Sequence, residues 1–131
     1  MNIEIEPQVN RLKITLTREF RFDAAQSLDV FPEGHKCRNL HGHTFRLQVS
    51  VTGEVDSQTG MFYDHAEIAK VVRPLVHQLD HSYLNEVPGL DCPTIENMCY
   101  WIWTKIESDL PGLSEIVLYE TPNTWCRYAG E

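Results

Sequence analysis

Two segments of the chain alternate apolar and polar residues, and this alternation limits the possible folds more than any other feature of the sequence. Side chains in a β-strand point alternately to its two faces, so each segment predicts a strand with one buried face. The apolar positions of the first segment are Leu12, Ile14, Leu16, Phe20 and Phe22. Those of the second segment are Phe45, Leu47, Val49 and Val51. The sequence therefore predicts a sheet that other elements cover on one side.

A first helix is expected over residues 65–79, between the second strand and the middle of the chain. Asp64 and Glu67 have the three-residue spacing of a capping box, which marks the start of a helix. Pro74 lies inside this segment and has no amide donor, so we expect a kink or a broken turn there. The apolar residues that recur at helical spacing are Ile68, Val71, Val72, Leu75 and Leu79.

A second helix is expected to begin at Pro93 and Thr94 and to end before Pro111 and Gly112, because these residues are typical start and stop signals. Its apolar stripe consists of Ile95, Met98, Cys99, Ile102, Ile106 and Leu110. Two more short strands follow, near residues 116–120 and 125–128. The order strand, strand, helix, helix, strand, strand predicts an α+β fold with a four-stranded antiparallel sheet and two helices on one face.

The length and charge of the chain restrict its class. A chain of 131 residues is expected to form one domain over residues 1–131. Its formal net charge of −8 argues against nucleic acid or an anionic membrane as a partner, because both are bound through Lys and Arg. No apolar run has the length of a membrane span, and the first residues do not resemble a signal peptide, so we expect a cytoplasmic protein with free thiols at its four cysteines.

Residues 24–40 lose the alternation and are expected to form a long loop, which is a common place for functional residues. At its end stands the sequence C-R-N-L-H-G-H, from Cys37 to His43. His41 and His43 are two positions apart, so on a strand their imidazoles point to the same face and could reach one metal ion. Two exposed histidines at a strand end are an equally good interpretation of the pair alone. Gly42 between them favours the metal site, because glycine in a strand often marks a close approach of the backbone to another group.

Cys37 admits three interpretations: a metal ligand, a small buried residue, or a reactive thiol. Lys36 and Arg38 flank it, and neighbouring positive charge stabilises a thiolate. Asp80 and His81, at the end of the first helix, offer a carboxylate and an imidazole for proton transfer, although a capping pair at the surface is equally compatible with the sequence. Glu120 shares a strand face with apolar residues, where a carboxylate either finds donors, such as the N–H groups of a ligand, or lies at the end of the sheet.

Several motifs together resemble the 6-pyruvoyltetrahydropterin synthase family. They are F-x-F-D-A-A near Phe20, P-E-G-H-K-C-x-x-x-H-G-H ending at His43, L-D-H-x-x-L-N from Leu79, P-T-x-E-N from Pro93, and E-T at Glu120. The resemblance covers nearly the whole chain. The three-residue spacing between Cys37 and H-G-H resembles the bacterial branch of the family, the 6-carboxy-5,6,7,8-tetrahydropterin synthases of the queuosine pathway.

The resemblance implies a tunnelling fold, in which neighbouring subunits close their sheets into a barrel and two trimers stack as a hexamer with sites between subunits. It implies that Cys37 is the general acid or base, with Asp80 and His81 as proton-transfer partners. Glu120, helped by Thr94, is then expected to bind the pterin ring. The implied reaction converts 7,8-dihydroneopterin triphosphate to 6-carboxytetrahydropterin, acetaldehyde and triphosphate. For the triphosphate, the candidate cations are Lys36, Arg38 and Arg46.

The metal ligands implied by the resemblance are His41, His43 and a third residue that departs from the family's pattern. The family has a histidine where this chain has Gln26. A carboxamide oxygen is a harder ligand than an imidazole, so we expect weaker zinc binding than in a Gln26→His variant, or a preference for Mn²⁺ or Fe²⁺. Three accounts stay open: Gln26 is a ligand, His35 or His65 replaces it, or the chain is a paralogue with a weak or different metal.

The leading hypothesis is a metal-dependent lyase of the queuosine branch, most simply a zinc enzyme. A second enzyme hypothesis is 6-pyruvoyltetrahydropterin formation or a side-chain aldolase activity. A third hypothesis, from a different class, is a pterin-binding protein without turnover whose metal site has degenerated at Gln26. The presence of Cys37, Asp80 and His81 argues against this last hypothesis, because a protein that only binds pterin needs none of them.

Overall fold

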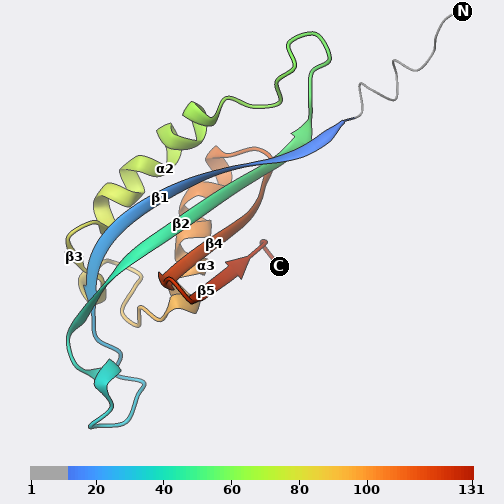
Figure 1. The fold of residues 1–131 in the computed structure, drawn as a ribbon. Coiled ribbons are helices and arrows are strands. Elements are labelled where there is room, and N and C mark those ends of the chain that lie inside the picture. Colours follow the sequence, from blue (N-terminus) through green and yellow to red (C-terminus); the bar gives the residue numbers. More distant parts are fainter. Residues whose placement is uncertain (1–11) are drawn as a thin grey trace, which may run out of the picture.

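The computed structural model describes residues 12–131, which form one sheet with two helices on one of its faces (Figure 1). The strand order is β3-β1-β2-β4-β5. The strands are β1 (Lys13–Gln26), β2 (His41–Glu54), β3 (Ser82–Tyr83), β4 (Leu113–Thr121) and β5 (Thr124–Tyr128), and the helices are α2 (His65–Leu79) and α3 (Ile95–Ile106). Short 3₁₀ turns occupy Lys36–Arg38, Leu84–Glu86 and Glu107–Asp109. The α+β class is therefore confirmed.

The sheet has five strands, whereas the sequence predicted four antiparallel ones. The four long strands pair antiparallel as expected, and β3 adds a parallel pair with the end of β1. In this pair Ala24 lies opposite Ser82 and Ala25 lies opposite Tyr83. A strand of two residues is too short to carry an alternating pattern, which is why the sequence did not indicate it. The sheet of the single chain is open, and α3 lies at its β4–β5 end (Figure 1).

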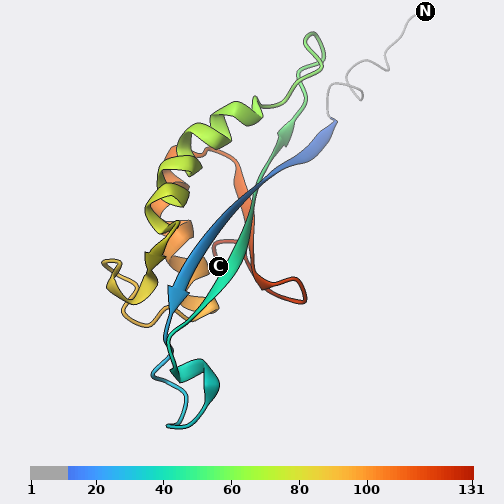
Figure 2. The ribbon, with the colours of Figure 1, turned by 60° about the vertical axis from the view of Figure 1, so that its left-hand side comes forward.

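Both helices lie on the same side of the strands, as Figure 2 shows. α2 packs against β1, and α3 packs against β4 and β5. The core lies between these layers and is built from the alternate strand residues that face the helices. Its largest fully buried side chains include Phe22, Phe45, Leu47, Ile68, Leu79, Met98, Ile102, Ile106 and Ile116. The alternation in the two long strands thus predicted the buried face correctly.

The long loop begins later than predicted, at residue 27, because β1 continues to Gln26. Ala24 and Gln26 are both buried and continue the inward-facing row of Phe22. Their backbone pairs with the start of β2, where Gln26 lies opposite His41. The loop 27–40 extends past the end of the sheet, beyond the part that the helices cover (Figures 1 and 2). This leaves a row of inward-facing positions available for a site.

Helix α2 has the predicted bounds and runs through Pro74 without the predicted interruption. Asp64 caps its first turn, with Oδ1 accepting a hydrogen bond from the amide of Ala66 at 2.9 Å. No helix among residues 12–131 is long and apolar enough to cross a membrane.

We expect Asp64→Ala to lower the free energy of unfolding by about 1 kcal/mol, because the first turn of α2 loses its capping acceptor. Urea denaturation followed by circular dichroism measures this change. Asp64→Asn, which keeps a side-chain oxygen at the cap, is the control, and its free energy of unfolding should fall by only about a few tenths of a kcal/mol. Equal losses in the two variants would contradict a capping role for this oxygen.

Candidate functional site

Four of the predicted site residues meet at the end of the sheet next to the loop 27–40. Gln26 ends β1, His41 and His43 begin β2, and Glu120 stands near the end of β4. By strand alternation all four belong to the face that carries the core, past the last core residues of their strands. The strands therefore place two imidazoles, a carboxamide and a carboxylate on one side of the sheet.

Gln26 is fully buried and joins this group through its amide. Its Nε2 donates a hydrogen bond to Glu120 Oε2 at 2.8 Å and lies 3.5 Å from His41 Nε2. Its Oε1 is buried and has no hydrogen-bond partner. A buried acceptor without a partner costs about 1–3 kcal/mol, and such an atom in a native site calls for a ligand or a functional reason.

The protonation of the two histidines follows from their surroundings. His41 Nδ1 lies 2.7 Å from the carbonyl oxygen of Asn39, and a carbonyl only accepts, so Nδ1 carries the hydrogen. In the neutral ring, the lone pair is then on Nε2, which faces Gln26. Burial lowers the pKa of His43, and His41 lowers it further, although Glu120 at 3.6 Å acts in the opposite direction. His41 Nε2 can thus offer its lone pair to a ligand, and burial favours the neutral, ligating form of His43.

Cys37 and the two histidines line one cavity of about 490 Å³ with Glu120. Cys37 lies in the 3₁₀ turn Lys36–Arg38 and is partly buried. His35 holds this turn, because its Nδ1 accepts a hydrogen bond from the amide of Cys37 at 3.0 Å. The apolar wall of the cavity includes Leu28 and Phe31. The cavity therefore combines a thiol, two imidazoles and a carboxylate.

Thr94 lies in a neighbouring cavity of about 360 Å³, which Glu120 also lines. It is the N-cap residue of α3, and its Oγ1 accepts a hydrogen bond from the amide of Asn97 at 3.2 Å. Leu28 and Phe31 belong to both cavities. Glu120 therefore stands where the two cavities adjoin, with the thiol on one side and Thr94 on the other.

Asp80 and His81 form a second group next to β3. Asp80 Oδ2 lies 3.1 Å from His81 Nδ1, and Asp80 Oδ1 accepts a hydrogen bond from the amide of Asp23 at 2.9 Å. This backbone hydrogen bond is the main reason why the pKa of Asp80 is lowered, so the residue is an anion at neutral pH. His81 has a φ of 58°, in the left-handed region that costs a side-chain-bearing residue about 1–3 kcal/mol. Such strain is typical of functional positions.

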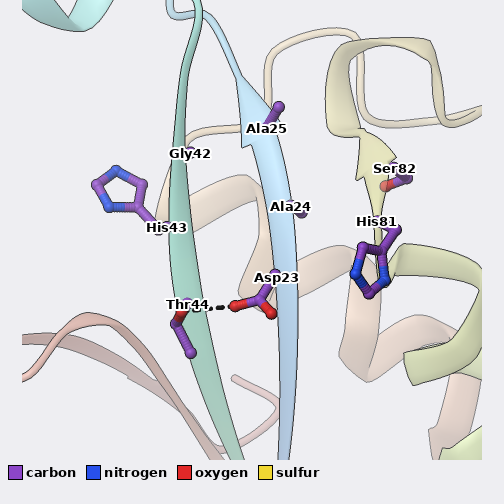
Figure 3. A pocket seen from close by; sticks show the side chains of 8 residues that line it. All are labelled: Asp23, Ala24, Ala25, Gly42, His43, Thr44, His81 and Ser82. Carbon is purple, nitrogen blue, oxygen red and sulfur yellow. Dashed lines mark hydrogen bonds between the residues drawn. The ribbon is translucent and has the colours of Figure 1, made fainter.

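The structure does not bring Cys37 to Asp80 and His81 within one chain. His81 lines a different cavity of about 500 Å³, together with Asp23 and Thr44. Figure 3 shows the His43 imidazole on the β2 side and the His81 imidazole on the β3 side, with β1 and β2 between them. The His81 side chain is 81% exposed. The dyad is therefore exposed and lines a cavity that Cys37 does not line, although His43 lines both cavities.

The histidines considered as substitutes for Gln26 are engaged elsewhere. His65 Nδ1 accepts a hydrogen bond from Arg18 at 2.9 Å, near the middle of β1. The His35 ring stacks on Phe31 with centroids 4.2 Å apart, and its Nδ1 accepts from Cys37 as described above. Gln26 is the candidate that stands beside His41.

The cations considered for a phosphate group also differ in their surroundings. Arg38 donates to the carbonyl oxygens of Asp29 and Phe31 and ties the loop together. Arg46 pairs with Glu19 at 3.0 Å on the other face of the sheet. Lys36 is exposed and lines the cavity of Cys37.

Two features of the site were missed by sequence reasoning. Asp23 stands within 4.8 Å of Asp80 and His81, counted between their possible ligand atoms, and its carboxylate accepts a hydrogen bond from Thr44. The sequence signal that could have identified Asp23 is a polar residue at an outward-facing position near the end of β1. The Gln26–Glu120 hydrogen bond joins residues 94 positions apart, and no local pattern indicates it.

Comparison with known proteins decides the family. The sequence model described as 6-pyruvoyl tetrahydropterin synthase matches residues 15–131. The chain belongs to this family. A 6-carboxy-5,6,7,8-tetrahydropterin synthase of Synechocystis sp. is 42% identical over 117 residues, which cover 85% of this chain and 89% of the relative. A dihydroneopterin monophosphate aldolase of Pyrococcus furiosus is 37% identical, with 83% of this chain and 91% of the relative covered.

A solved structure supports the same assignment. The 6-pyruvoyl tetrahydropterin synthase of Caenorhabditis elegans superposes with a TM-score of 0.84 at 28% identity, and the match covers 93% of this chain and 99% of that one. The tunnelling-fold architecture predicted for the subunit is therefore confirmed.

Proposed function

We propose that the protein is a pterin lyase that converts 7,8-dihydroneopterin triphosphate and water to 6-carboxy-5,6,7,8-tetrahydropterin, acetaldehyde and triphosphate, as a step of queuosine biosynthesis. The observation that carries this proposal is the position of Glu120, at the junction of the Cys37 cavity and the Thr94 cavity. A carboxylate there can anchor a ring while the ring's side chain lies beside the thiol. The Synechocystis relative, named as a synthase of this product, supports the choice.

Ring binding is assigned to Glu120 and Thr94. A pterin ring presents adjacent N–H donors on its pyrimidine edge, and a carboxylate can accept two such donors side by side. Thr94 lines the cavity on the far side of Glu120. Leu28 and Phe31 give apolar contact for a flat ring in both cavities. Lys36 at the wall of the thiol cavity is our candidate for a phosphate contact.

Proton transfer is assigned to Cys37, Asp80 and His81. Cys37 shares its cavity with Glu120, so a ring held by that carboxylate places its side chain near the thiol. Asp80, kept anionic by the Asp23 amide, orients the His81 ring through the contact of its Oδ2 with Nδ1. His81 then delivers or removes a proton at the substrate or at Cys37.

Because Cys37 and His81 line different cavities of one chain, we propose that a complete site combines Cys37 of one subunit with Asp80 and His81 of a neighbour. The exposure of the His81 ring and the open sheet of the single chain support an assembly of this kind. The hexamer of two stacked trimers remains part of this proposal.

The donor set next to Cys37 fits a divalent cation. His41 and His43 stand two positions apart on one face of β2, and Gln26 can present a carboxamide oxygen, an atom that otherwise has no partner. His41, His43 and Gln26 would hold the ion, either Zn²⁺ or a harder ion such as Mn²⁺ or Fe²⁺. When bound, such an ion acidifies substrate hydroxyls and polarises a carbonyl.

Product analysis tests the proposal and separates it from the alternatives. The protein is incubated with 7,8-dihydroneopterin triphosphate and with Zn²⁺, Mn²⁺ or Fe²⁺ in turn, and the products are identified by mass spectrometry. We expect 6-carboxytetrahydropterin and acetaldehyde. Release of glycolaldehyde triphosphate and 6-hydroxymethyl-7,8-dihydropterin would favour the side-chain aldolase activity for which the Pyrococcus relative is named. 6-Pyruvoyltetrahydropterin would favour the synthase that gives the family its name. Ring binding without turnover would favour the non-catalytic hypothesis.

A further inference from the structure

Gln26 connects the two halves of the site, the imidazoles and the ring-binding carboxylate. We propose that its amide has two orientations that couple metal binding to pterin binding. With Nε2 turned inward, the amide donates a hydrogen bond to Glu120. With Oε1 turned inward to a bound cation, this hydrogen bond is absent and Glu120 is free for the pterin ring. This inference rests on the proposed ring-binding role of Glu120. It makes Gln26 a positioning residue, because its effect on the substrate passes through Glu120.

The inward position of Nε2 follows from the charges around it. An amide oxygen placed 2.8 Å from a carboxylate oxygen would be repelled, whereas an N–H at this position is attracted. The second hydrogen of Nε2 faces the lone pair of His41 Nε2 at 3.5 Å. In the described structure, the amide nitrogen thus bridges a carboxylate and an imidazole, a place that suits a positively charged group.

A cation at the imidazoles reverses this preference. A half-turn about the last side-chain torsion exchanges Oε1 and Nε2, and the oxygen then faces the side where His41 presents its lone pair. The cation attracts this oxygen and offsets the repulsion from Glu120. Oε1 has no partner to lose in the half-turn, because it is buried without a hydrogen bond. The half-turn does break the hydrogen bond from Nε2 to Glu120, so it occurs only when the attraction between the cation and Oε1 exceeds that loss.

The half-turn changes what Glu120 can bind. With Nε2 inward, one carboxylate oxygen already accepts a hydrogen bond, and a pterin ring has to compete for it. With Oε1 inward, both carboxylate oxygens can accept N–H donors from the ring. Metal and ring should thus strengthen each other's binding by the same factor, as linkage requires.

A binding cycle with 6-methylpterin tests the coupling, because this ligand has the same pyrimidine edge as the substrate's ring but no side-chain hydroxyls to bind a metal. Its dissociation constant is measured by fluorescence titration on the metal-free protein and on the protein saturated with Zn²⁺.

For the wild type we expect Zn²⁺ to tighten 6-methylpterin binding about tenfold, within the usual range of coupling between two sites. Gln26→Leu, which can neither donate to Glu120 nor offer an oxygen to the cation, should bind the ring equally well with and without Zn²⁺. Gln78→Leu, the same change at an exposed position of α2, should keep the wild-type factor.

The outcomes are distinct. If the wild type binds 6-methylpterin equally well with and without Zn²⁺, the coupling is wrong and the proposed function stands. If Gln26→Leu keeps the tenfold effect, the coupling comes from direct contact between ring and metal, which also overturns the inference. If the wild type binds no 6-methylpterin in either state, ring binding itself fails and the proposed function falls with it. Gln26→Met, an unbranched residue of similar length, is the second variant should Gln26→Leu not fold, and it should likewise lose the factor.

Discussion

Replacing Cys37 by alanine is expected to lower kcat for 7,8-dihydroneopterin triphosphate by about 10²–10⁴-fold, the usual contribution of a positioned acid or base. Binding of 6-methylpterin should stay within about twofold of wild type, because Glu120 and Thr94 are unchanged. Steady-state kinetics and fluorescence titration measure the two quantities. A loss confined to kcat would assign the thiol to proton transfer rather than to ring binding.

Cys92→Ala is the matched control for Cys37→Ala. Cys92 is a partly buried free thiol that lines neither the Cys37 cavity nor the Thr94 cavity. Its variant should keep wild-type kcat. If Cys37→Ala also kept kcat within about threefold, an acid–base role for this thiol would be wrong.

Mixing two inactive variants is expected to restore activity if the site is shared between subunits. Cys37→Ala and His81→Ala each remove one contribution, and the 81% exposure of the His81 side chain makes its removal compatible with folding. In a randomly mixed assembly, about a quarter of the sites combine an intact Cys37 from one subunit with an intact His81 from its neighbour. Activity should therefore return to about a quarter of the wild-type value after co-refolding of equal amounts.

A mixture of Cys37→Ala with Cys37→Ser is the control, because both variants lack the same contribution and no combination is complete. It should stay as inactive as its components. If the mixture of Cys37→Ala and His81→Ala showed only the average activity of its two components, the thiol and the dyad would not come from different subunits.

Local patterns predicted the elements of this fold but not how they fit together. The alternation of Phe20 and Phe22 and of Phe45 and Leu47 gave the buried face of each long strand, because that face depends only on the period of two. Alternation does not set the register between strands. The pairing of Gln26 with His41, which extends β1 into the predicted loop, was therefore not predictable from either segment alone.

The candidate site was likewise predictable where it depends on local sequence and not where it depends on long-range packing. The residues of C-R-N-L-H-G-H were singled out by type and spacing, and the structure places Cys37, His41 and His43 around one cavity with Glu120. The hydrogen bond from Gln26 to Glu120 and the separation of Cys37 from His81 depend on long-range packing. Within one chain they divide the candidate site into two groups that line different cavities, with His43 at the wall of both.

The most direct test of the central claim is the rate at which wild-type protein and Glu120→Gln form 6-carboxytetrahydropterin from 7,8-dihydroneopterin triphosphate. We expect the wild type to release acetaldehyde and 6-carboxytetrahydropterin in equal amounts. Glu120→Gln should lower kcat/KM by about 10–100-fold, because charged hydrogen bonds to the ring are lost. Absence of the product with Zn²⁺, Mn²⁺ and Fe²⁺ alike, or an unchanged kcat/KM in Glu120→Gln, would contradict the account.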